Sequence, residues 1–197
     1  MVLISRIFFF LTFFCCCLET NAQKNFSEGY IILLSGDTVY GKVNDHFRAY
    51  NNMPKKIKFI GKEGKEEKYL ANKIKGYSKG DVSKYISIAD LKDHSPFFAK
   101  VLIEGPVTLL TTAVEYSGGI NTNDVFSLSN KTIYYFLKHL RKKSTHQVSD
   151  LQFKADMSNY FSDYPELQQQ IINKELRFAD MEIIVTKYNQ WYISNNK

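Results

Sequence analysis

The chain has 197 residues, of which 44% are hydrophobic and 15% aromatic, and it carries a formal net charge of +6. This length corresponds to one domain, or one domain with an appendage, and the composition excludes a low-complexity chain. The three cysteines stand side by side at positions 15–17. If that segment is removed, the remaining chain can hold no disulfide, thiolate nucleophile or cysteine-bound metal.

The first 22 residues have the pattern of a secretory signal peptide. An apolar run of twelve residues extends from Ile7 to Leu18 and follows a single charged side chain, Arg6. Twelve residues are too few to span a bilayer, which needs about 20, but they suit the apolar core of a signal. We therefore predict a signal peptide over residues 1–22.

The residues after this run predict the cleavage point. Small Thr20 and Ala22 precede Gln23, and signal peptidase needs small side chains at those two places. A lipoprotein signal is one alternative, but it requires a small residue before the modified cysteine, and Cys15 follows Phe14. An uncleaved anchor is the other. Cleavage between Ala22 and Gln23 would export the mature chain, which would be periplasmic, outer-membrane-associated or secreted.

Residues 23–148 predict a β-rich domain. The segment "GYIILLSGDTVYGKV" has two strand-like runs, with Gly36 and Asp37 at the two central positions of a tight turn. The segment "KIKFIGKEGKEEKYL" repeats this pattern around a turn from Gly61 to Gly64.

Four further runs extend the pattern. They are "SKYISIAD", "FFAKVLIEG", "PVTLLTTAVEY" and "TIYYFLKHL", the last of which fits a strand or a short helix equally well. Gly105 and Pro106 suit the connection between the second and third runs, because proline cannot donate a hydrogen bond within a ladder. About seven strands with short turns predict an antiparallel sandwich or an open barrel.

The apolar residues take a helical period after residue 149. In the first predicted helix they are Leu151, Ala155, Met157, Tyr160 and Phe161. In the last they are Met181, Ile184, Val185, Tyr188, Trp191 and Tyr192. Such a stripe is typical of a core-facing helix, so we do not assign a cofactor site to it.

A further helix is predicted between these two. Asp163, with Glu166 three residues later and Pro165 between them, resembles a capping box at a helix start. The whole chain is therefore predicted to have an α+β class, with a helical segment over residues 149–197 packed on the β-domain.

The succession of "GDTVYGKV", "FFAKVLIEGPVTLL", "YYFLKH", "YFSDYPELQQQI" and "IIVTKYNQW" resembles uncharacterised secreted proteins that are common in the Bacteroidetes. The resemblance extends over almost the whole mature chain, and its motifs are turns, apolar strands and a helix start. It implies export and this architecture. It implies no activity and no functional residue.

Candidate catalytic residues are scattered along the chain. The histidines are His46, His94, His139 and His146. They form no HExxH motif, and a polar turn separates the last two. Asp93, His94 and Ser95 are the residue types of a hydrolase triad, but triad side chains converge in space rather than in sequence. Because no G-x-S-x-G elbow accompanies them, we interpret this segment as a solvated turn.

Carboxylates offer a second route to an enzyme. Glu104 and Glu115 lie near predicted strand ends and could flank a sugar bond, although most β-proteins contain such pairs. Convergence of several of Asp93, His94, Glu104, Glu115 and Asp124 in one pocket would indicate a hydrolase. We predict no metal and no cofactor from this pattern.

Charge is the asymmetric feature of the chain. Positions 55–84 contain ten lysines and four acidic residues. This window therefore carries a net charge of +6, equal to that of the whole chain. The candidate binding residues for an anionic surface are Lys55, Lys56, Lys58, Lys62, Lys65, Lys68, Lys73 and Lys75. Lysine suits diffuse anionic surfaces. The alternative interpretation is the solvated face of a half-buried hairpin, where edge lysines oppose aggregation.

These patterns favour an exported, non-enzymatic, envelope-associated binding or structural protein. Its expected partner is an anionic envelope surface, such as lipid headgroups or acidic glycans, or an envelope protein. Nucleic acid is not expected as a partner, because no stacking motif is present and the chain is exported. No transmembrane span is expected in the mature chain. The alternative function is a secreted hydrolase with an unrecognised carboxylate or histidine site.

Overall fold

The computed structural model describes residues 25–45, 54–80, 83–89, 95–117, 129–142 and 144–196. Within these segments the strands end by Val148, and α-helices follow from Phe153, as the predicted α+β class requires. The predicted signal peptide and the cleavage site between Ala22 and Gln23 lie outside the described residues.

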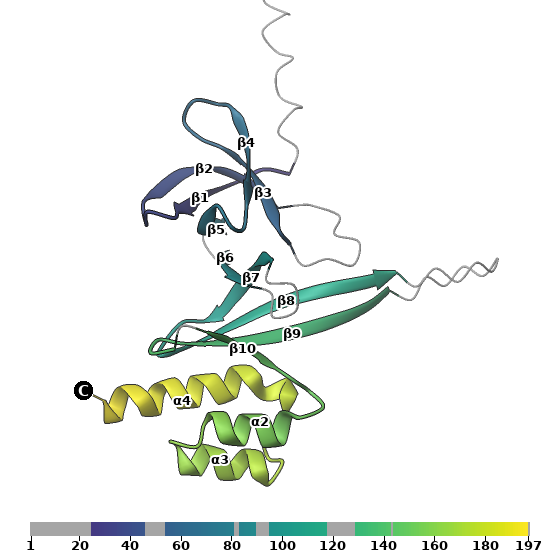
Figure 1. Ribbon diagram of the computed structural model, residues 1–197, viewed down its shortest axis with the longest axis vertical. Coiled ribbons are helices and arrows are strands. Elements are labelled where there is room, and N and C mark those ends of the chain that lie inside the picture. Colours follow the sequence, from purple (N-terminus) through teal and green to yellow (C-terminus); the bar gives the residue numbers. More distant parts are fainter. Residues whose placement is uncertain are drawn as a thin grey trace, which may run out of the picture.

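Among the described residues, ten strands form one open antiparallel sheet (Figure 1). They are β1 (Ser27–Leu33), β2 (Thr38–Asn44), β3 (Lys56–Ile60), β4 (Glu66–Leu70), β5 (Ile74–Lys79), β6 (Ser83–Ala89), β7 (Pro96–Ile103), β8 (Val107–Ser117), β9 (Ser129–His139) and β10 (Thr145–Val148). Their order is β10-β9-β8-β7-β6-β5-β1-β2-β3-β4. Antiparallel pairing is confirmed, but the predicted count of about seven is too low. One continuous sheet is present in place of a sandwich or barrel.

The sequence pattern missed β5 and β10 for local reasons. β5 contains Gly76, and glycine weakens a strand pattern. Glycine is nevertheless needed there, because a Cβ would lie 2.2 Å from the carbonyl oxygen of Tyr85 on β6. β10 has four residues, "THQV", whose polar character resembles a turn. The ambiguous segment "TIYYFLKHL" lies in β9, which pairs along its length with β8.

The β1–β2 connection differs from the predicted two-residue turn. The N–H of Gly36 donates to the carbonyl oxygen of Leu33 at 3.0 Å, so Gly36 is the last residue of the turn. Its φ of 107° lies in the region that favours glycine. The second predicted turn is confirmed, since the N–H of Gly64 donates to the carbonyl oxygen of Gly61 at 3.0 Å.

Strands β1–β5, which we call the N-terminal region, curl around their own apolar core. The core residues are Ile31, Val43, Ile57, Phe59, Ala71, Ile74, Tyr77 and, from β7, Phe98. These strands are not all neighbours, so the sheet must bend to bring the side chains together. Two hydrogen bonds hold the bend: Phe98 N–H donates to Pro54 O at 2.7 Å, and Ser87 Oγ donates to Ala71 O at 2.6 Å.

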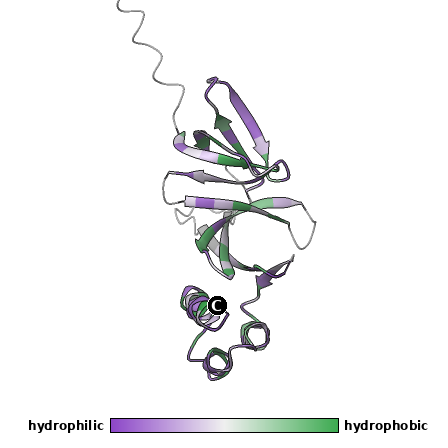
Figure 2. Ribbon diagram, turned by 90° about the vertical axis from the view of Figure 1, so that its left-hand side faces the viewer, coloured by the Kyte–Doolittle hydropathy of each residue, from purple (hydrophilic) through white to green (hydrophobic). Residues whose placement is uncertain are grey.

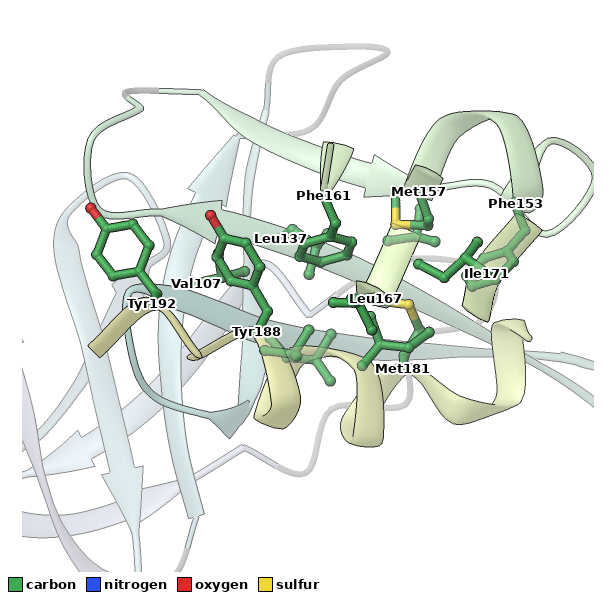
Figure 3. Close-up of a cluster of buried hydrophobic side chains, with 14 residues drawn as sticks. Val107, Leu137, Phe153, Met157, Phe161, Leu167, Ile171, Met181, Tyr188 and Tyr192 are labelled. Carbon is green, nitrogen blue, oxygen red and sulfur yellow. The ribbon is translucent and has the colours of Figure 1, made fainter. Parts of the chain in front are cut away.

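Helices cover one face of β7–β10, and together these elements form what we call the C-terminal region. The helices are α2 (Phe153–Tyr160), α3 (Pro165–Ile172), the 3-10 helix η2 (Phe178–Asp180) and α4 (Met181–Asn195). Val107, Leu109 and Leu137 of the sheet meet apolar side chains from α2, α3 and α4 in one buried cluster (Figure 3). The predicted stripe on α4 is confirmed, since Met181, Ile184, Val185, Tyr188 and Tyr192 are buried.

Two details of the predicted helices are wrong. Leu151 is fully exposed and precedes α2, which buries Phe153 instead. Tyr164, not Asp163, occupies the N-cap of α3, and no side chain caps this helix. The Asp163 carboxylate accepts a hydrogen bond from the Tyr188 hydroxyl at 2.7 Å. Asp163 therefore bonds to a side chain of α4 instead of capping the start of α3.

A buried asparagine joins α4 to the sheet. The Asn189 side chain accepts the N–H of Val107 and donates to its carbonyl oxygen, each at 2.8 Å. These backbone groups stand where the Gly105–Pro106 connection interrupts the ladder between β7 and β8. A Cβ on Gly105 would lie 2.5 Å from Asn189 Nδ2, so glycine is required for this close approach.

Candidate functional site

Strands β3 and β4 form a hairpin with a strongly basic outer surface, which we call the basic hairpin (residues 56–70). Ile57 and Phe59 point into the core, so Lys56 and Lys58 lie on the outward face of β3. Lys68 lies directly opposite Lys58 in the register of β3 and β4. The hairpin lies at the opposite end of the molecule from the helices (Figure 1), and a largely hydrophilic strand stands at that end in Figure 2.

The acidic residues of the hairpin offset only part of this charge. Glu66 forms an ion pair with Lys58 at 2.7 Å. Glu67 accepts a hydrogen bond from the Tyr69 hydroxyl at 2.6 Å, and this bond, more than burial, raises the pKa of Tyr69. Lys68 has no ion-pair partner within the described part of the chain.

The turn of the hairpin adds two more lysines. Lys62 and Lys65 are exposed there. Neither has an ion-pair partner among the residues that the structure describes. Glu66 already supplies an anion beside the opposed Lys58–Lys68 pair, so the charge left without an acidic partner in the described hairpin is that of Lys62, Lys65 and Lys68.

The structure divides the predicted lysine strip. Lys73 and Lys75 are exposed but lie at the far end of the hairpin, beyond β4; one strand of five residues separates them from the tip, or about 17 Å. Lys55 is half-buried, and its Nζ donates to Ser95 Oγ at 2.6 Å. Lys79 pairs with Asp45 at 2.5 Å, and Lys84 pairs with Glu104. The eight candidate lysines therefore do not form one surface.

The candidate catalytic residues of the sequence are not brought together where the structure describes them. His46, Asp93, His94 and Asp124 lie outside the described residues, as does the side chain of Glu115. Glu104 forms an ion pair with Lys84. In the described segments, no three histidine, cysteine, aspartate or glutamate side chains are arranged to hold a metal ion.

A polar pocket between β10 and α2 holds the arrangement closest to a catalytic one. His146 Nε2 lies 2.9 Å from Asp156 Oδ2, and Ser144 also lines this pocket of about 250 Å³. The Ser144 hydroxyl makes no hydrogen bond to any described residue, so it is not aligned with the imidazole as a nucleophile. Burial raises the pKa of Tyr160, in the same pocket, to about 12. This tyrosine is therefore neutral near pH 7.

Sequence analysis missed a groove on the helix-bearing face of the sheet, which we call the sheet groove. It lies between the N-terminal region and α4 and has a volume of about 480 Å³. Its floor is a transverse row in which Tyr85 pairs with Lys100, Lys100 with Thr111, and Thr111 with Tyr135. Phe98, Leu102, Ala113 and Ile133 add apolar surface beside the row. No sequence signal could have found this row, because its members lie on four separate strands.

Both ends of the row are supported by aromatic packing. Tyr85 stacks on Tyr77 of the N-terminal core with ring centroids 4.5 Å apart and planes inclined by 7°. Tyr135 packs against Phe178 of η2 at 5.2 Å. Burial, followed by the nearby Asp45 carboxylate, raises the pKa of Tyr85, so its hydroxyl remains protonated.

No protein-family model, curated protein or solved structure matches the chain. Within the described residues, the helices are too short or too polar to cross a bilayer.

Proposed function

We propose that this chain is an exported, non-enzymatic envelope protein that adheres to an anionic surface through the tip of the basic hairpin. The observation that carries the proposal is that Lys62, Lys65 and Lys68 are exposed and have no ion-pair partner among the described residues. Because these three charges have no acidic partner in the described part of the chain, an anionic surface can take that place.

The magnitude of the attraction sets the type of binding. Each lysine close to an anionic membrane contributes about 1 kcal/mol, and the effect decays over a Debye length of about 8 Å at physiological salt. Lys73 and Lys75 lie about 17 Å from the tip and add little when the tip is in contact. Adhesion is therefore expected to be weak, reversible and sensitive to salt.

Export is supported by the apolar run before "TNA" and by the resemblance to secreted proteins of the Bacteroidetes. The protein would be periplasmic, outer-membrane-associated or secreted. A hydrolase is the second candidate, and its supporting observation is the His146–Asp156 pair at 2.9 Å. The binding function is favoured because Ser144, the nearby hydroxyl, is not aligned with that pair.

The test is sedimentation of the mature chain with vesicles of phosphatidylcholine alone or mixed with phosphatidylglycerol. We expect binding only to the anionic vesicles, and release when the salt concentration is raised. The double variant Lys62→Glu with Lys65→Glu should lose most of this binding. A matched control, Lys138→Glu with Lys154→Glu, makes the same change in net charge on exposed lysines of the C-terminal region and should retain it.

Two results would contradict the proposal. If the folded hairpin variant sediments as well as the wild type, the tip is only a solvated surface. If both double variants lose binding equally, net charge rather than the hairpin is responsible. Circular dichroism of each variant establishes that it is folded before it is compared.

A further inference from the structure

We propose that the sheet groove binds an amphipathic carboxylate, meaning a small molecule with one carboxylate on an extended apolar body. The inference does not depend on the basic hairpin. It rests on the transverse row Tyr85–Lys100–Thr111–Tyr135 and on the apolar side chains beside it.

Lys100 defines the charge of the ligand. It is half-buried in the groove floor, and no described acidic side chain lies within 4.0 Å of its Nζ. A cation held against apolar surface loses hydration and gains most from an anionic partner of the ligand.

The apolar part of the groove defines the rest of the ligand. Phe98, Leu102, Ala113 and Ile133 line it, and Ile133 is 46% exposed. The row crosses four neighbouring strands, so the floor is about 14 Å wide at the usual interstrand spacing. A volume of about 480 Å³ lies in the usual range for small-molecule sites, about 300–1,000 Å³. These dimensions suit a medium-length acyl chain or a comparable ring system.

An acidic residue fixes the orientation. Glu182, in the first turn of α4, lines the groove on the helix side. Its carboxylate repels an anionic head group, so the ligand carboxylate should face Lys100, away from α4. The stacking of Tyr85 on Tyr77 and the hydrogen bond from Thr111 Oγ1 to Tyr134 O at 3.2 Å hold the floor in place before binding. Such preorganisation lowers the entropic cost of association.

The test is isothermal titration of the mature chain with decanoate, and separately with decan-1-ol, which has the same chain without the charge. We expect decanoate to bind with a stoichiometry of one, and Lys100→Met to weaken it at least tenfold. Lys100→Met should leave the affinity for decan-1-ol unchanged, because methionine keeps the apolar stem. The matched control is Lys138→Met, an exposed lysine of β9 outside the groove, which should change the decanoate affinity less than twofold.

A second variant tests the apolar part of the site. Ala113→Trp places a large ring in the groove at an exposed position and should abolish binding of both probes. The inference is overturned if wild type does not bind decanoate, if Lys100→Met binds it as wild type does, or if Lys138→Met loses as much affinity. Lys100→Met should still sediment with anionic vesicles, so failure here is distinguishable from failure of the hairpin proposal.

Discussion

The two regions of this molecule bury one sheet in two different ways. In the N-terminal region the strands have five to seven residues and curl until their inward side chains meet, so no helix is needed. In the C-terminal region β8 and β9 have eleven residues each, and helices cover one face. A curled sheet leaves its outer face in water, and the exposed lysines of the basic hairpin lie on such a face. A helix-covered sheet is left open only where the helices end, which is where the sheet groove lies.

Strand β7 of the C-terminal region contributes side chains to the cores of both regions. Phe98 is part of the N-terminal core, whereas Leu102 and Ile103 pack against the helical core. Phe97 and Ala99 face the opposite side and form a third cluster with residues of β6, β8 and β9. Because every core includes or touches this strand, we expect the two regions to unfold as one cooperative unit.

The largest expected effect comes from a matched pair of core truncations. Ile57→Ala in the N-terminal core and Ile184→Ala in the helical core each remove a fully buried side chain. Each should lower the free energy of unfolding by about 2–5 kcal/mol. The measurement is urea denaturation followed by circular dichroism and by the fluorescence of Trp191, the single tryptophan, which stacks on Tyr164 at 4.8 Å.

These two signals report different parts of the molecule. If the regions are one unit, Ile57→Ala shifts the Trp191 transition as far as the circular dichroism transition, although Trp191 lies in α4. A circular dichroism transition that moves while the Trp191 transition stays at the wild-type midpoint would show that the regions unfold separately.

The second effect concerns the attachment of α4 to the sheet. Asn189→Ala leaves the buried N–H and carbonyl of Val107 without the partners that they now have at 2.8 Å. We expect a loss of about 1–3 kcal/mol in the free energy of unfolding. Asn195→Ala is the control, because it removes an exposed asparagine that bonds only to its own helix, at Trp191 O. Equal losses in the two variants would show that helix propensity, not the attachment to Val107, is responsible.

The smallest effect is a dependence of stability on pH that arises from a histidine of the C-terminal region. Burial, followed by the charge of Lys142, lowers the pKa of His139. Its Nδ1 also accepts the N–H of Arg141 at 3.1 Å, which requires that nitrogen to be unprotonated. Among the described residues, histidines occur only in this region.

The direction of this pH dependence follows from comparing the folded and unfolded chain. A histidine in the unfolded chain takes up a proton near pH 6.5, whereas folded His139 takes one up only at a lower pH. Its contribution to the free energy of unfolding is therefore fully present above pH 6.5 and is lost as the pH falls through the lowered pKa of the folded state. The change in free energy of unfolding between pH 7.5 and pH 5.5 should be smaller in His139→Gln than in wild type. An identical pH dependence in wild type and His139→Gln would remove His139 as the cause.

Local signals explain what could be predicted from the sequence. Alternation of Ile57 and Phe59 with lysines, and a glycine turn after them, was sufficient for the β3–β4 hairpin, because pairing across a short turn involves few residues. The stripe on α4 was also sufficient, since its period is a property of one helix. Leu151 was misplaced because a helical period near a chain turn does not fix where the helix begins.

Tertiary structure alone decided the charge pattern and the groove. The sequence by itself determined a window with a charge of +6, but strand order decided that Lys79 meets Asp45 and Lys84 meets Glu104. The row of Tyr85, Lys100, Thr111 and Tyr135 spans 51 positions of the chain and exists only through the register of four strands. Register depends on packing among distant segments, and a shift of one residue would turn each of these side chains to the other face.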